Sequence, residues 1–137
     1  MRKQNIAVTV DAVILYRKAG ILNVLLIKRK NEPFRDQWAL PGGFLEENET
    51  MEEGAKRELE EETGLKLEKL QQVGAFGTPG RDPRGRTISI AFVGLIDAEP
   101  KVKASDDALD VKWFNMSDLP NLAFDHLKII SEANSLL

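Results

Sequence analysis

The chain of 137 residues is 42% hydrophobic and 30% charged, which suits one globular domain spanning residues 1–137 with an apolar core. A net charge of −3 and a pI near 5.3 argue against a nucleic-acid partner, because affinity for a phosphate backbone depends on Lys and Arg. The sequence has no cysteine, and no apolar run approaches the roughly 20 residues that cross a bilayer, so we expect a cytoplasmic protein without a membrane partner.

The N-terminal third of the chain predicts a β-hairpin followed by a short strand. Residues 6–16 alternate Val and Ile with polar positions, and residues 22–28 form a second apolar run after an Ala-Gly turn. Because Asp11 interrupts the first run and no small-residue cleavage site follows, we interpret it as a strand rather than a signal peptide. Residues 38–44 predict a further strand that enters a tight turn at a pair of glycines.

A helix is predicted from about Met51 to Thr63. Thr50 and Glu53 have the spacing of a capping box, in which each side chain accepts a backbone N–H of the other residue. Gly64 stands where a left-handed C-terminal cap is expected.

This helix and the loop before it are strongly acidic, since residues 43–65 contain nine of the 22 acidic residues of the chain. Glu58, Glu61 and Glu62 are spaced i, i+3 and i+4, so their carboxylates share one helix face and repel each other by roughly 0.2–0.5 kcal/mol a pair. A bound divalent cation would convert that repulsion into attraction. Spacing alone equally allows a solvated acidic face.

The second half of the chain predicts three more strands and one more helix. The strands fall at residues 66–76, 87–96 and 110–114. The helix runs from about Phe124 to Ser135, with an inner side made by Leu127, Ile130 and either Ala133 or Leu137. Strands interleaved with two helices indicate an α/β fold with a mixed sheet covered on both faces, an α/β/α sandwich.

The acidic stretch resembles the signature box of the Nudix hydrolases. The resemblance rests on Gly43, Glu49, Arg57-Glu58-Leu59, Glu61-Glu62 and Gly64-Leu65. It implies the Nudix fold and hydrolysis of a nucleoside diphosphate linked to another moiety. It also implies that Mg²⁺ or Mn²⁺ is held by the Gly43 carbonyl with Glu58, Glu61 and Glu62, that Arg57 orients a glutamate, and that Glu49 assists.

The loop within residues 77–92 is the candidate for substrate selection. Arg81, Arg84 and Arg86 lie among Gly and Pro, and guanidinium groups match phosphate oxygens, although Arg-Asp alternation is also typical of surface ion pairs. The segment resembles the PGRDPRGR loop of ADP-ribose pyrophosphatases, and Pro79 occupies the position associated with ADP-ribose hydrolysis. The later DDALDVKWF and LAFDH segments extend this resemblance. It implies cleavage of ADP-ribose to AMP and ribose 5-phosphate by a homodimer.

The general base is left open between two sets of acids. Asp106 and Asp107 lie on a late loop of the kind that closes over the diphosphate in relatives, and Asp107 is our candidate. If that loop does not reach the substrate, Glu58 or Glu61 must activate the water.

Three further residues bear on the expected site. Arg29 ends a strand where it can reach a phosphate, and Phe34 is a candidate for stacking on adenine. His126, the single histidine, is interpreted as a packing or capping residue rather than a base.

The sequence also allows two alternative functions. One is a pyrophosphohydrolase acting on nucleoside triphosphates, such as oxidised nucleotides. The other is a non-catalytic sensor that binds ADP-ribose, against which we count the complete set of box glutamates and the lack of room for a DNA-binding domain after Leu137.

Overall fold

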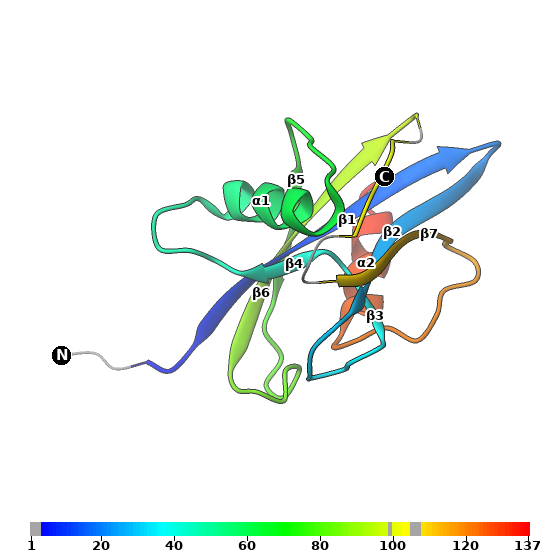
Figure 1. Ribbon diagram of the computed structural model, residues 1–137. Coiled ribbons are helices and arrows are strands. Elements are labelled where there is room, and N and C mark those ends of the chain that lie inside the picture. Colours follow the sequence, from blue (N-terminus) through cyan, green and yellow to red (C-terminus); the bar gives the residue numbers. More distant parts are fainter. Residues whose placement is uncertain (1–3, 99, 105–107) are drawn as a thin grey trace.

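The computed structural model describes residues 4–98, 100–104 and 108–137. Within them, one seven-stranded sheet carries a helix on each face (Figure 1). The strands are β1 (Ala7–Lys18), β2 (Ile21–Arg29), β3 (Trp38–Ala39), β4 (Gly42–Phe44), β5 (Gln71–Phe76), β6 (Thr87–Ile96) and β7 (Ala108–Asn115). The helices are α1 (Met51–Thr63) and α2 (His126–Asn134), and neither is long and apolar enough to span a membrane. The predicted α/β/α sandwich is confirmed.

The sheet is mixed, and β1 lies at its centre. The strand order is β3-β2-β1-β6-β5, with β4 paired to β1 and β7 paired to β2. β1 and β6 run parallel, whereas the other pairs are antiparallel. On its other edge, β1 pairs with β2 near the hairpin and with β4 from Thr9 to Asp11. The predicted tight turn at the glycine pair is wrong, because Gly42 and Gly43 lie in β4 and the chain bends at Pro41. Residues 41–43, called the glycine turn below, lie against the central strand.

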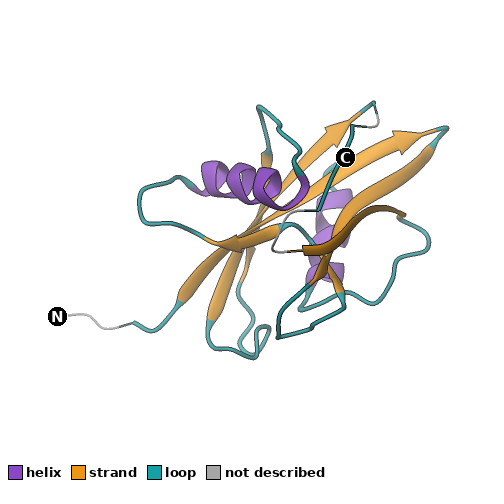
Figure 2. Cartoon of the chain, in the orientation of Figure 1, coloured by secondary structure: helices purple, strands orange, loops and turns teal. Residues whose placement is uncertain are grey.

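Each face of the sheet has its own apolar core, because successive side chains of a strand point to opposite sides. One core joins the sheet to α1 and contains Val10, Ala12, Ile14, Ala55 and Leu59. The other joins the sheet to α2 and contains Val13, Leu15, Ile129, Ile130 and Ala133. Figure 2 shows the two helices on opposite sides of the strands.

α1 begins and ends where the sequence predicts. The Thr50 hydroxyl accepts the Glu53 N–H at 3.1 Å, and the Glu53 carboxylate accepts the Thr50 N–H at 2.8 Å. Gly64 adopts a φ of 77° and donates its N–H to the Glu60 carbonyl at 2.8 Å. Both ends of the acidic helix are therefore fixed by local hydrogen bonds.

Thr50→Ala should lower the free energy of unfolding by about 1 kcal/mol, because it removes the oxygen that accepts an orphan N–H of the first turn. Urea unfolding followed by circular dichroism measures the change. Thr78→Ala, at an exposed loop threonine, is the control and should leave the midpoint in place. Equal unfolding midpoints for the three proteins would contradict the capping assignment.

The start of α2 and its buried face differ from prediction. Phe124 has a φ of 53°, which an α-helix does not accept, so the helix begins at His126. The predicted inner residues Leu127 and Leu137 are 60% and 53% exposed. The buried side is His126, Ile129, Ile130 and Ala133, so the prediction is confirmed for Ile130 and Ala133 and wrong for Leu127 and Leu137. The error arose because the histidine was not counted as part of the inner stripe.

Two predicted strand boundaries also shift. The strand predicted at residues 66–76 begins only at Gln71. Residues 38–44 form two short strands rather than one, because Pro41 has no N–H to donate between β3 and β4. The predicted β1–β2 hairpin is confirmed, with left-handed backbone at Ala19 and Gly20 in its turn.

Candidate active site

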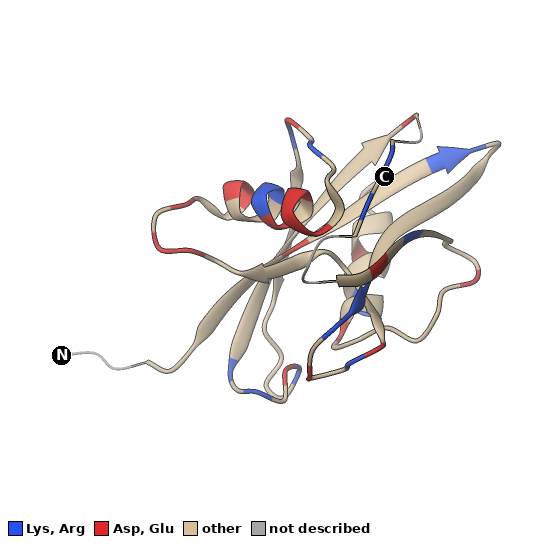
Figure 3. Ribbon diagram, in the orientation of Figure 1, with Lys and Arg blue, Asp and Glu red and all other residues tan. Residues whose placement is uncertain are grey.

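Acidic residues recur along α1 and the loop before it (Figure 3). Two of those on the helix, Glu58 and Glu62, contact the glycine turn. A Cβ atom added to Gly43 would fall 2.6 Å from the carboxyl carbon of Glu58, closer than real Cβ atoms come. The close approach of the Glu58 carboxylate to the turn therefore depends on glycine at this position.

Glu58 and Glu62 form a carboxylate pair beside the turn. Glu62 is only 5% exposed, and its Oε1 accepts the backbone N–H of Gly42 at 3.0 Å. Burial, followed by the hydrogen bond with Glu58, raises the pKa of Glu62 well above its ordinary range. A hard divalent cation, which prefers oxygen ligands, would offset the repulsion between the two carboxylates.

Arg57 connects the loop before α1 to this pair. Its Nε and Nη2 atoms donate to both oxygens of Glu49 at 2.9 and 2.7 Å. Its Nη1 donates to Glu58 at 2.6 Å, and its Nη2 also donates to the Phe44 carbonyl at 3.1 Å. The guanidinium thus fixes the orientation of Glu58, and the hydrogen bonds from Arg57 in turn hold the pKa of Glu49 below its usual value.

The ligand set expected from the resemblance stays a prediction. Glu58 and Glu62 lie together against the glycine turn, whereas the Glu61 side chain is 51% exposed and contacts Arg57 at 3.3 Å. Within the part of the chain that the structure describes, no three His, Cys, Asp or Glu side chains lie close enough together to hold a metal ion. A cation held by all four predicted ligands would draw Glu61 toward the pair.

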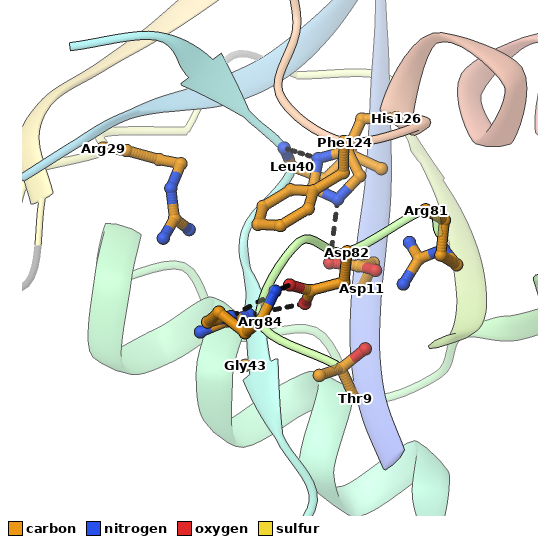
Figure 4. Close-up of a pocket in the computed structure, with 11 residues that line it drawn as sticks. Thr9, Asp11, Arg29, Leu40, Gly43, Arg81, Asp82, Arg84, Phe124 and His126 are labelled. Carbon is orange, nitrogen blue, oxygen red and sulfur yellow. Dashed lines mark hydrogen bonds and ion pairs between the residues drawn. The ribbon is translucent and has the colours of Figure 1, made fainter. Parts of the chain in front are cut away.

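A second feature of the site is a basic pocket on the other side of the glycine turn (Figure 4). Its walls come from β1, the end of β2, the glycine turn, the loop between β5 and β6, and the start of α2. The lining residues that bear on its chemistry are Asp11, Arg29, Arg81, Arg84, Phe124 and His126.

Arg29 and Arg84 make this pocket suited to an anion. Both guanidinium groups lie over the Phe124 ring, at 5.1 and 5.7 Å from its centroid. Burial and the charge of Arg84 together lower the pKa of Arg29. Asp82 binds Arg84 through two hydrogen bonds of 3.1 and 2.8 Å. An anionic ligand between the two arginines would relieve their remaining repulsion.

The other predicted loop residues have different surroundings. Arg81 lines the pocket, but its side chain is only 4% exposed and binds Asp125 through two hydrogen bonds of 3.0 and 2.6 Å. Arg86 donates to the Gly77 carbonyl on an exposed stretch. Of the four loop residues predicted to bind substrate, Pro79 and Arg86 lie outside the lining of this pocket.

The aromatic residue at the pocket is Phe124 rather than Phe34. Phe34 packs edge-on against the Phe124 ring, with centroids 4.7 Å apart, so it supports the ring that faces the arginines. The general-base candidates Asp106 and Asp107 lie outside the described residues.

His126 and Asp11 form the floor of the pocket. The Leu40 N–H donates to His126 Nδ1 at 3.0 Å, and His126 Nε2 lies 3.6 Å from Asp11 Oδ1. The Ser89 hydroxyl donates to the other Asp11 oxygen. Burial lowers the pKa of His126, so the ring is neutral, and the packing interpretation agrees with its 4% exposure.

The lowered pKa of His126 predicts a loss of stability in acid. In the unfolded chain the ring titrates near 6.5, so below that pH the unfolded state binds a proton that the folded state does not. The stabilisation is complete above the unfolded pKa and is lost as the pH falls through the folded pKa. Denaturant unfolding from pH 8 to 5 should show up to about 1.4 kcal/mol lost per pH unit in part of this range, and His126→Asn should flatten it. Parallel pH profiles would contradict the buried neutral ring.

Several pocket residues were missed by sequence reasoning, and Asp11, Asp82 and Phe124 are those that bear on its chemistry. Asp11 carried a usable signal, because an acid inside an apolar strand has to be either exposed or functional, and it is 5% exposed. Phe124 carried none, since its position depends on the left-handed backbone that precedes α2.

The site has paired carboxylates on one side of the glycine turn and a basic pocket on the other, an arrangement that suits hydrolysis of a phosphoanhydride. The chain belongs to the Nudix family, because the family profile described as NUDIX domain matches residues 6–133.

Named relatives agree with this assignment. The ADP-ribose pyrophosphatase of Methanocaldococcus jannaschii is 49% identical over 127 residues, which are 92% of this chain and 72% of that protein. The ADPR responsive transcriptional repressor NtrR of Acinetobacter baylyi is 35% identical over 129 residues, 91% of this chain but only 52% of the repressor. The NUDIX domain of Shewanella oneidensis NrtR, solved with ADP ribose, has a TM-score of 0.92 at 33% identity, covering 98% of this chain and 90% of that one.

Proposed function

We propose that the protein hydrolyses ADP-ribose to AMP and ribose 5-phosphate with the help of Mg²⁺ or Mn²⁺. The observation that carries the proposal is that Arg29, Gly42 and Gly43 line both the basic pocket and the adjoining hollow that contains Glu58 and Glu62. A diphosphate bound by the arginines therefore lies next to the cation ligands. The 49% identity to an archaeal ADP-ribose pyrophosphatase supports this substrate.

The donor set suits the cation that the family implies, since the Glu58 and Glu62 carboxylates lie together beside the backbone of Gly42 and Gly43. The ligands we propose are the Gly43 carbonyl with Glu58, Glu61 and Glu62. When bound, the cation would neutralise phosphate oxygens and lower the pKa of a water molecule.

The protein residues supply position and charge. Arg29 and Arg84 bind the diphosphate oxygens, and the Phe124 ring holds both guanidinium groups in place. Arg57 and Glu49 keep the Glu58 carboxylate oriented toward the turn. The water gives its proton to Asp107 if the late loop reaches the substrate, and otherwise to Glu58 or Glu61.

The direct test incubates purified protein with ADP-ribose and Mg²⁺ or Mn²⁺ and identifies products by chromatography. Release of AMP and ribose 5-phosphate, abolished by EDTA and restored by the cation, is expected. Reaction in ¹⁸O water shows which phosphorus is attacked. No AMP release with either cation would refute the proposal.

The same assay separates the two alternatives. A triphosphate pyrophosphohydrolase would release pyrophosphate from oxidised nucleotides with a much higher kcat/KM than for ADP-ribose. A sensor would bind ADP-ribose in calorimetry without turning it over.

Further expectations from the sequence stay predictions within this proposal: a homodimer, a cytoplasmic location, and no nucleic-acid partner. Size-exclusion chromatography with light scattering tests the first.

A further inference from the structure

The segment just before and at the start of α2 contacts both halves of the site. Asp125 binds the loop between β5 and β6 through Arg81, and the next residue, His126, binds the segment before the glycine turn through the Leu40 N–H. Phe124, one residue earlier, lies under the pocket arginines. Three consecutive residues thus contact elements that are far apart in the sequence.

The contact to the loop is a partly buried ion pair. The Arg81 and Asp125 side chains are 4% and 21% exposed, and two parallel hydrogen bonds join them. Burial disfavours the charge on Arg81, but the Asp125 carboxylate outweighs it, so the pKa of the guanidinium is raised. Because Asp82 follows Arg81 and binds Arg84, the ion pair fixes the part of the loop that carries Arg84.

The contact to the glycine turn runs through a neutral histidine ring. Nδ1 of His126 accepts from Leu40, so the ring proton is on Nε2, which faces Asp11. The Asp11 carboxylate also lies where a side chain on Gly42 would be. Leu40 and Gly42 are two residues apart, so the histidine and the aspartate hold the turn from both ends.

We propose that Asp125 and His126 together form a positioning pair, in which Asp125 sets the place of the Arg84 loop and His126 sets the place of the glycine turn. This inference rests on the proposed function, because it assigns the turn to the cation and the loop to the diphosphate. We therefore expect substitution of His126 to weaken cation binding and substitution of Asp125 to raise KM for ADP-ribose.

The histidine half is tested with two replacements. His126→Asn puts an amide oxygen where Nδ1 stood and keeps the acceptor for Leu40, whereas His126→Gln reaches the Nε2 position and leaves the Leu40 N–H without it. The Mn²⁺ dissociation constant of the substrate-free protein, measured by electron paramagnetic resonance, should rise about fivefold or more for His126→Gln, as expected for one lost buried hydrogen bond. For His126→Asn it should stay within about twofold.

The aspartate half is tested with Asp125→Asn, which cannot accept both hydrogen bonds of Arg81. KM for ADP-ribose should rise about tenfold, because the loop loses a charge-assisted pair, while the Mn²⁺ dissociation constant stays within about twofold. Glu132→Gln makes the same chemical change at an exposed position of α2 and should alter neither quantity. If Asp125→Asn does not fold, Arg81→Lys tests the same contact, since lysine cannot bind both carboxylate oxygens in parallel.

The outcomes separate this inference from the proposed function. Variants that change both quantities in proportion to their loss of thermal stability, or an equal response to Asn and Gln at position 126, would overturn the positioning pair. Wild-type protein that binds Mn²⁺ without hydrolysing ADP-ribose would overturn the substrate alone, and the Mn²⁺ measurements would still decide the role of His126. Wild-type protein that binds no Mn²⁺ would overturn both.

Discussion

Glu58→Gln is expected to lower kcat for ADP-ribose roughly a thousandfold while the protein stays folded, since loss of a cation ligand removes several kcal/mol of transition-state stabilisation. Glu58 interacts with Glu62, accepts a hydrogen bond from Arg57 and lies where a side chain on Gly43 would be. The fold should tolerate the change, because the amide keeps the shape of the side chain and relieves the pairing of two carboxylates. Steady-state kinetics at saturating Mg²⁺ measure the effect.

Glu60→Gln is the matched control on the same helix. Glu60 pairs with the exposed Lys66 at 3.2 Å, and surface ion pairs of this kind contribute little. Its kcat should stay within about twofold of wild type. A Glu58→Gln enzyme as active as the Glu60→Gln enzyme would remove Glu58 from the cation site.

Alanine substitutions at the two neighbouring glycines should have different effects. Gly42→Ala should lower the stability of the fold, whereas Gly43→Ala should lower kcat. At Gly42 the new Cβ would meet the backbone carbonyl of Val10 as well as the Asp11 carboxylate. Backbone cannot move aside, so Gly42→Ala should cost about 3 kcal/mol of folding free energy. At Gly43 the new Cβ would meet only the carboxylate end of Glu58, a flexible side chain.

Gly43→Ala should therefore fold with nearly wild-type stability and yet lose roughly a hundredfold in kcat, because the displaced Glu58 can no longer face the turn. Urea unfolding and steady-state kinetics on both variants make the comparison. If Gly43→Ala were unstable and Gly42→Ala stable, the assignment of the two glycines to opposite sides would be wrong.

The sequence predicted the parts of the fold that depend on local chemistry. α1 is confirmed to the residue at both ends, because the Thr50–Glu53 box and the Gly64 cap are complete within the helix itself. The β1–β2 hairpin is confirmed because its turn at Ala19 and Gly20 is likewise a local feature. α2 was misjudged because its start depends on the backbone of Phe124 and its buried face depends on a histidine, and both are set by distant partners.

The candidate site also has one part that local sequence predicts and one part that it does not. The acidic face was evident from spacing, since i, i+3 and i+4 positions are neighbours on any helix. The pocket was not, because Asp11, Arg29 and Phe124 come from three separate elements. Arg81, Arg84 and Arg86 are alike in sequence, yet the structure gives them different neighbours: the Asp125 carboxylate, the ring of Phe124 and a backbone carbonyl, respectively.

The pairing of β4 with β1 has a consequence for how such a site can change. Gly42 pairs with Asp11 and Gly43 with Val10, so the absent side chain of one glycine opens the face of α2 and that of the other opens the face of α1. The proposed cation site and the basic pocket thus lie on opposite sides of the sheet and meet at Arg29, Gly42 and Gly43, which line both. Substitutions on the pocket side that leave the glycine turn in place can therefore change substrate recognition without displacing the carboxylate pair, so the two parts of the site can vary separately within one folded domain.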